Sequence, residues 1–92
     1  MKKCVKLLFE SSQAQKVLVS FIANQAGLYK IEGIGQKINL DSIQLFVCGQ
    51  EHQVDDFIDA LYVGTNSIQL KNIKIETCST DRSYRGVFRI VD

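Results

Sequence analysis

The chain has 92 residues, of which 46% are hydrophobic and 23% are charged. This composition excludes a disordered or fibrous protein, and the length suffices for one hydrophobic core but not for two domains. Eleven Lys and Arg against ten Asp and Glu leave a net charge of +1, which excludes the strongly positive field typical of many nucleic-acid-binding proteins. We therefore predict a single domain over residues 1–92, in which any charged ligand is bound by local groups.

The first predicted strand covers residues 3–10, where Val5, Leu7 and Phe9 share one face and Lys6 lies on the other. The basic start superficially resembles a signal peptide, but Lys6 interrupts the apolar run and no small-residue cleavage site follows. Nowhere does the sequence approach the roughly 18 apolar residues of a membrane span. We therefore expect a cytoplasmic protein that does not bind a membrane.

A helix is predicted next, because Ser12 and Gln15 have the spacing of a capping box. Apolar residues then follow at helical spacing and indicate one buried face: Ala14, Val17, Leu18, Phe21 and Ile22. Gly27 is a suitable C-terminal cap for this helix.

Two strands joined by a turn are predicted after the helix. The first runs from Tyr29 to about Ile34, and the third strand of the chain covers 42–48 and ends at Gly49. The turn between them is assigned to glycines and polar residues: Gly33, Gly35 and residues 36–41. Their short connection favours an antiparallel hairpin.

The second predicted helix has the clearer pattern. Its apolar stripe consists of Val54, Phe57, Ile58, Leu61 and Tyr62. Its acidic residues are interpreted as a solvated face rather than a metal site: Asp55, Asp56 and Asp59. Gly64 is predicted to cap its end.

The last elements are two strands. The fourth strand is predicted over about 67–77, with a β-bulge or bend at Lys71 and Asn72, where the alternation slips by one residue. A loop at 79–83 precedes a final short strand at 86–91. The order βαββαβ plus a short C-terminal strand predicts a ferredoxin-like two-layer α+β sandwich, with an antiparallel sheet and two helices on one face.

The three cysteines are Cys4, Cys48 and Cys78, and they are widely spaced. One hypothesis is a metal site with His52, the only histidine, or a reactive thiol. The spacing favours the other interpretation, in which they are small core or strand residues in a reducing compartment. We therefore predict no metal site.

An anion-binding site is a hypothesis for the connection between the first strand and the first helix. Backbone amides at a helix start attract anions, and Lys16 lies in the first turn. The candidate residues of this site are Ser11, Ser12, Gln13, Ala14, Gln15 and Lys16. Glu10, which directly precedes them, would repel a phosphate or carboxylate.

The order of elements, the AGL that ends the first helix, the acidic second helix and the closing YRGVFRI resemble the acylphosphatase family. The resemblance extends from Val5 to Val91. It implies the ferredoxin-like fold, hydrolysis of the carboxyl-phosphate bond of acyl phosphates, and no cofactor.

The segments that carry chemistry in that family differ here. The family has a phosphate-holding loop of the type GxVQGVGFR, and this chain has LFESSQAQK, with Ser12 and Ala14 in place of glycines and Lys16 in place of arginine. Lysine keeps the charge but lacks the planar two-pronged contact. The family's water-orienting Asn falls on Ile34, which cannot form a hydrogen bond, and using Asn39 instead needs a shift of five residues.

Two hypotheses follow. In the first, the domain is a catalytically impaired acylphosphatase relative that acts by binding or assembly, with phosphate, a small acyl phosphate, a protein or a second copy as partner. In the second, it is an active acylphosphatase that holds phosphate at the start of the first helix through Lys16. A nucleic-acid partner is not expected, because residues 42–48 lack the basic, glycine and aromatic signature of RNA-recognition strands.

Overall fold

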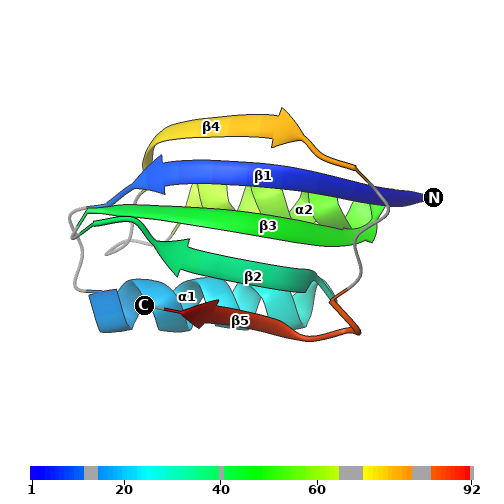
Figure 1. The fold of residues 1–92 in the computed structure, drawn as a ribbon, viewed down its shortest axis with the longest axis horizontal. Coiled ribbons are helices and arrows are strands. Elements are labelled where there is room, and N and C mark those ends of the chain that lie inside the picture. The colour runs from blue at the N-terminus through cyan, green and yellow to red at the C-terminus, as the bar shows by residue number, and fades with distance from the viewer. Residues whose placement is uncertain (12–14, 40, 65–69, 80–83, 92) are drawn as a thin grey trace.

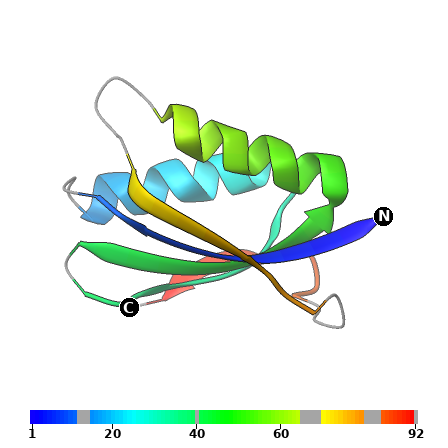
Figure 2. The ribbon, with the colours of Figure 1, turned by 90° about the horizontal axis from the view of Figure 1, so that it is seen from above.

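The fold is a five-stranded sheet with two helices packed on one face (Figures 1 and 2). It was obtained as a computed structural model that describes residues 1–11, 15–39, 41–64, 70–79 and 84–91. The elements are β1 (Lys2–Glu10), α1 (Gln15–Leu28), β2 (Glu32–Lys37), β3 (Ser42–Gln50), α2 (Glu51–Val63), β4 (Lys71–Thr77) and β5 (Phe88–Val91). Neither described helix is long and apolar enough to cross a membrane.

The strand order is β4-β1-β3-β2-β5. β1 pairs antiparallel with β3 and β4, and β2 pairs antiparallel with β3, as the sequence predicts. β5, however, lies parallel to β2, so the sheet is mixed rather than antiparallel. The reason is topological. β4 occupies the edge beside β1, so the last strand is added at the opposite edge, beside β2, and the chain returns there in the same direction as β2.

The core lies between the sheet and the helices. The inward residues of β1 and β3 are those predicted from alternation, and all of them are buried: Val5, Leu7, Phe9, Ile43, Leu45 and Val47. Leu18, Phe21 and Ile22 of α1 and Val54, Phe57 and Leu61 of α2 pack against them. Two predicted stripe residues differ, because Val17 and Tyr62 are about half exposed at 49% and 58%.

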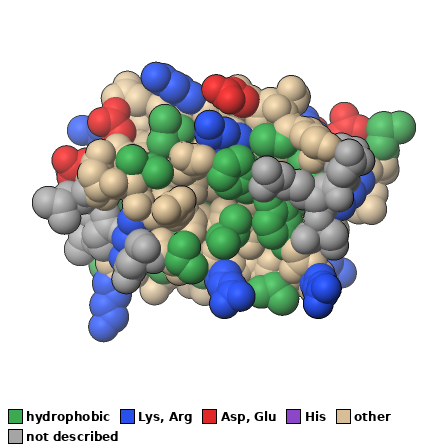
Figure 3. Space-filling model, viewed as in Figure 1, with side chains coloured by type: hydrophobic (Ala, Val, Ile, Leu, Met, Phe, Trp, Pro, Cys, Tyr) green, Lys and Arg blue, Asp and Glu red, His purple; other side chains and the backbone are tan. Residues whose placement is uncertain are grey.

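The opposite face of the sheet carries no helix (Figure 2). Figure 3 shows apolar side chains gathered across the middle of this face. Cross-strand pairing places Leu8, Phe46 and Ile34 here, and each is half-buried. We call this surface the open face.

The end of α1 differs from the prediction. Gly27 lies inside the helix, and the residue beyond the helix in the left-handed conformation is Lys30, with φ 57°. The Ile31 N–H donates to the Ala26 carbonyl at 2.8 Å and the Lys30 N–H to the Gly27 carbonyl at 3.3 Å, which is the Schellman pattern. Tyr29, expected to begin a strand, therefore belongs to the turn.

Replacing Lys30 by glycine is expected to stabilise the protein by about 0.5–1 kcal/mol. The left-handed conformation costs a non-glycine residue about 1–2 kcal/mol, which is partly offset by the greater freedom of glycine in the unfolded chain. Urea unfolding measures the change. Lys30→Ala is the control, since alanine keeps the penalty, and equal stability of the two variants would contradict this account of the turn.

β2 also begins later than predicted and contains both glycines that were assigned to a turn. Gly33 and Gly35 are buried on the helix side of the sheet. A Cβ on Gly33 would lie 2.0 Å from the Phe46 carbonyl oxygen, and one on Gly35 would lie 2.6 Å from Leu45 Cδ2. These glycines therefore permit close packing inside the sheet rather than a reversal of the chain.

The irregularity predicted in the fourth strand is confirmed. The register between β1 and β4 shifts between Leu8, which faces Lys74, and Glu10, which faces Lys71. Asn72 adopts a φ of 54°, as the extra residue of a bulge does. β4 begins at Lys71, and residues 67–69 of the prediction lie outside the described part of the chain.

One ion pair joins the start of β1 to α2. Lys3 Nζ donates to Asp55 Oδ1 at 2.7 Å, and this hydrogen bond raises the pKa of Lys3 above its usual value. α2 itself ends as predicted, since the Gly64 N–H donates to the Ala60 carbonyl at 3.0 Å.

Candidate functional site

One end of the sheet gathers the segments for which anion binding was predicted. β1 ends there, β3 and β4 begin there, and α1 starts beside them (Figure 1). The Ser11 N–H donates to the Asp41 carbonyl at 2.8 Å and so ties the β1–α1 connection to the turn between β2 and β3. Ser11 is only 3% exposed, which makes this link part of the packed structure.

The candidate anion-binding residues fall into three groups. The Ser11 amide is already used by Asp41 and does not point free toward a ligand. Lys16 is exposed in the first turn of α1, and Gln15 is its first residue. Ser12, Gln13 and Ala14 lie outside the described residues, as does the predicted Ser12 cap.

A hollow of about 200 Å³ lies next to Ser11. Its lining consists of Glu10, Ser11, Asp41, Lys71 and Asn72. Asn72 Nδ2 donates to Glu10 Oε2, so the bulge in β4 holds the carboxylate at the end of β1. Two acidic side chains and one lysine make this lining better suited to hydrogen-bond donors and cations than to a phosphate.

Neither family position that was carried over from the resemblance lines this hollow. Ile34 lies in the middle of β2, opposite Phe46 of β3 and Arg89 of β5, on the open face. Lys16 is on the opposite, helical layer of the molecule. Asn39 lies at the same end of the sheet as the hollow, but its Oδ1 accepts the Asp41 N–H at 2.9 Å and so stabilises its own turn.

Metal ligands are not brought together in the described part of the chain. No group of three or more His, Cys, Asp or Glu lies close enough to hold an ion there. His52 is exposed on α2. Cys4 and Cys48 form a disulfide, so their sulfurs are not available as thiolate ligands.

The disulfide corrects the interpretation of the cysteines. Cys4 and Cys48 are buried, as expected, but they face each other across β1 and β3 and are bonded to each other. The sequence held a signal for this pairing. Both residues directly flank the core stripes of their strands, so pairing those stripes antiparallel also pairs the cysteines.

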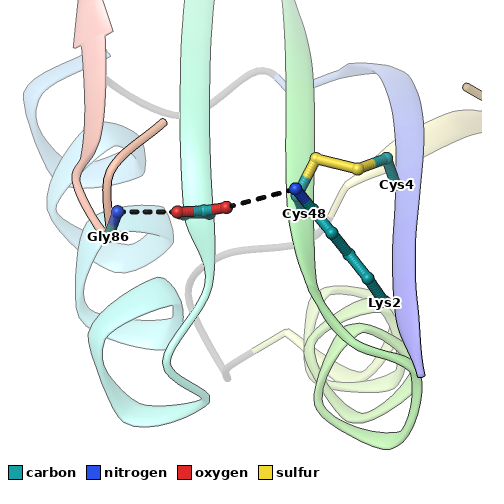
Figure 4. A network of polar contacts seen from close by, with 5 residues as sticks. Lys2, Cys4, Cys48 and Gly86 are labelled. Atoms are coloured by element: carbon teal, nitrogen blue, oxygen red, sulfur yellow. Dashed lines mark hydrogen bonds and ion pairs between the residues drawn. A yellow bond between two sulfur atoms is a disulfide. The ribbon is translucent and has the colours of Figure 1, made fainter. Parts of the chain in front are cut away.

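A second contact that the sequence analysis missed anchors the start of β5. Glu32 Oε2 accepts the Gly86 N–H at 2.6 Å, and Glu32 Oε1 lies 3.9 Å from Lys2 Nζ (Figure 4). Gly86 has a φ of 73°, which suits glycine. The contact fixes the YRGVFRI segment beside β2.

Comparisons with known proteins agree with this geometry at the level of the fold. The acylphosphatase family model matches residues 15–90. This match includes Lys16 and Ile34 but begins after Leu8–Ala14, which the resemblance aligns with most of the family's phosphate-holding loop. A comparison with the sequences of curated proteins gives no match.

Solved structures with the same fold include two acylphosphatases. The structure from Bacillus subtilis has a TM-score of 0.79 at 18% identity, and the match covers 100% of both chains. The structure from Coxiella burnetii has a TM-score of 0.78 at 16% identity, with 98% of this chain and 93% of the other covered. Full-length HypF, in its phosphate- and nucleotide-bound form, has a TM-score of 0.81 at 17% identity, and the match covers all of this chain but 12% of HypF.

Proposed function

The chain belongs to the acylphosphatase family, and from this premise we propose that it is a catalytically impaired member that acts by binding or assembly. In the family's reaction, fixed donors hold the phosphate of an acyl phosphate while a water attacks it. Preorganised donors of this kind are each worth about 3–4 kcal/mol of transition-state stabilisation. A chain that lacks several of them retains the fold without an appreciable rate.

Ile34 is the observation on which the proposal mainly rests. By the resemblance it falls on the position where the family has its water-orienting Asn, and its side chain has no hydrogen-bonding atom. Its cross-strand neighbours are Phe46 and Arg89, and it lies three residues before the end of β2. Asn39, the nearest downstream amide, does not replace it, because its Oδ1 accepts the Asp41 N–H within its own turn.

Charge at the sheet end supports the same proposal. Glu10 and Asp41 line the hollow beside Ser11 and oppose a doubly charged phosphate. Lys16 offers one ammonium where the family has an arginine, and an ammonium cannot contact two phosphate oxygens in one plane. The proposed ligand is therefore held weakly through phosphate, or is a protein or a second copy of the chain.

Hydrolysis of benzoyl phosphate tests the proposal. We expect benzoyl phosphate to be hydrolysed no faster with the purified protein than in the buffer alone. Inorganic phosphate should leave the melting temperature unchanged, because only a ligand that binds the native state raises its stability. Lys16→Ala is compared with Lys30→Ala, which removes an exposed lysine from the other end of α1. Turnover above background that falls about 100-fold or more in Lys16→Ala alone would establish the active-enzyme hypothesis instead.

The proposed location is the cytoplasm. The half-buried free thiol of Cys78 is typical of a reducing compartment, whereas the Cys4–Cys48 disulfide is typical of an oxidising one. Alkylation of thiols in acid-quenched cells, followed by mass analysis, distinguishes a reducing from an oxidising compartment. Alkylation of Cys4 and Cys48 as well as Cys78 is the result expected in the cytoplasm. Alkylation of Cys78 alone, with the disulfide retained, would contradict this location.

A further inference from the structure

The three cysteines lie in one row across three neighbouring strands. Cys4 of β1 is directly opposite Cys48 of β3, and the two form the disulfide. On the other side of β1, Val5 faces Thr77, and the ladder continues by one residue because the Cys78 N–H donates to the Cys4 carbonyl at 3.0 Å. Cys78 is therefore the neighbour of Cys4 opposite to Cys48.

The backbone pattern of Cys4 explains both neighbours. Its carbonyl points to β4, so the pair with Cys48 is of the non-hydrogen-bonded kind, in which side chains approach most closely. The Cα atoms of Cys4 and Cys48 are accordingly 4.2 Å apart. A hydrogen-bonded pair such as Cys4 and Cys78 has a Cα separation of about 5.5 Å, which also lies within the range that a disulfide spans.

Residues directly opposite each other in a sheet project from the same face. Val5, Leu7 and Phe9 point to the helices, so Cys4, Cys48 and Cys78 all project from the open face. Their side chains therefore follow one another along a line that crosses the strands. This is the direction in which a thiolate attacks a disulfide, with the leaving sulfur on the far side.

Access to solvent differs sharply along the row. Cys4 is 3% exposed and Cys48 is 1% exposed, so an external thiol cannot reach either sulfur in the folded protein. Cys78 is free and only half-buried. Among the three, it is the cysteine that is both next to Cys4 in the ladder and partly exposed to solvent.

We propose that Cys78 is the exchange thiol of the Cys4–Cys48 disulfide, and that the three residues form a thiol–disulfide relay. The Cys78 thiol loses its proton to solvent, and the thiolate attacks Cys4 Sγ. The Cys4–Cys78 bond forms as the Cys4–Cys48 bond breaks, and Cys48 leaves as a thiolate that takes up a proton. The step exchanges one disulfide for another, with no net oxidation or reduction.

Reduction then proceeds through the exposed end of the row. A small-molecule thiol attacks Cys78 Sγ of the exchanged form, and Cys4 leaves as a thiol. A second small-molecule thiol releases Cys78 and carries away the oxidised pair as a disulfide. The structure holds the Cys4–Cys48 disulfide, so this form is the resting state and the exchanged form is the reactive minority.

A pair of serine variants tests the geometry. Cys48→Ser leaves Cys4 next to Cys78, and air oxidation is expected to give a Cys4–Cys78 disulfide, seen by mass analysis of a non-reduced digest. Cys4→Ser is the matched control: it removes the same native disulfide, but Cys48 and Cys78 are separated by β1 and should both be alkylated. Two alkylated cysteines in each variant would overturn the proposal.

A kinetic experiment keeps the native disulfide and does not depend on those variants folding. Cys78→Ser should slow reduction of Cys4–Cys48 by dithiothreitol under native conditions by about tenfold or more, because the external thiol loses its accessible target. In urea, where all sulfurs are exposed, Cys78→Ser and the natural chain should be reduced at equal rates. Equal rates under native conditions would rule out the relay.

Discussion

Replacing Gly33 by alanine is expected to destabilise the protein by about 3–6 kcal/mol, a large part of the 5–15 kcal/mol typical of a domain. The new Cβ would lie 2.0 Å from the Phe46 carbonyl oxygen, which is backbone and cannot rotate away. The φ of Gly33 is 155°, a value that side chains rarely adopt. Relief requires β2 to move away from β3, which disrupts the antiparallel pairing of these two strands around Gly33 and Val47.

Urea unfolding followed by circular dichroism measures this loss, and Gly27→Ala is the control. Gly27 is exposed inside α1, and a Cβ there meets nothing within 4 Å. Alanine at Gly27 should therefore stabilise the protein by about 0.5–1 kcal/mol through helix propensity. A loss below about 1 kcal/mol for Gly33→Ala would show that the strand pairing is looser than described.

Phe57→Ala is expected to cost about 3–5 kcal/mol, because it empties a fully buried position between α2 and the sheet. The Phe57 ring also meets the ring of Phe88 edge to face, with centroids 6.5 Å apart. Such a pair contributes about 0.5–1.5 kcal/mol beyond its buried area. Phe57 thus holds the last strand as well as the centre of the core.

The control for Phe57 is Tyr62→Ala, which removes an aromatic ring of similar size from the same helix at a position that is 58% exposed. Its stability should change by no more than about 0.5 kcal/mol. A double-mutant cycle with Phe88→Ala then isolates the ring contact. If Phe57→Ala and Tyr62→Ala had equal effects, the position of α2 over the core would be wrong.

Much of the fold follows from local signals. Alternation in β1 and β3 predicted their buried residues, because a strand with one solvated face must repeat with period two. The slip at Lys71 and Asn72 predicted the bulge for the same reason. α2 was predicted to its capping glycine, because its apolar stripe and Gly64 agree.

Other features depend on distant partners. Gly33 and Gly35 have the composition of a turn, and only the Phe46 carbonyl and the Leu45 side chain explain why they lie inside a strand. The residue that follows α1 in the left-handed conformation is Lys30, although this conformation favours glycine. The prediction that the nearby Gly27 caps the helix was therefore wrong. The parallel pairing of β5 is set by which sheet edge is vacant, and this is not encoded in residues 88–91 alone.

The candidate site was predictable only in part. The substitutions at Lys16 and Ile34 are visible in the sequence, and the structure adds that Ile34 belongs to the open face. The contact of Asn72 with Glu10 was not predictable, because it joins residues on β4 and β1 through a bulge. The Cys4–Cys48 bond likewise needs the pairing register of β1 and β3.

The bulge in β4 has a consequence for the protein at high concentration. The outer side of β4 is an unpaired edge, which in a flat strand would be a template for fibrils. Asn72 twists this edge, and Lys71 and Lys74 place exposed positive charge on it. The other edge, β5, is only four residues long. The outer strands therefore protect the sheet from aggregation while its core stays strongly apolar.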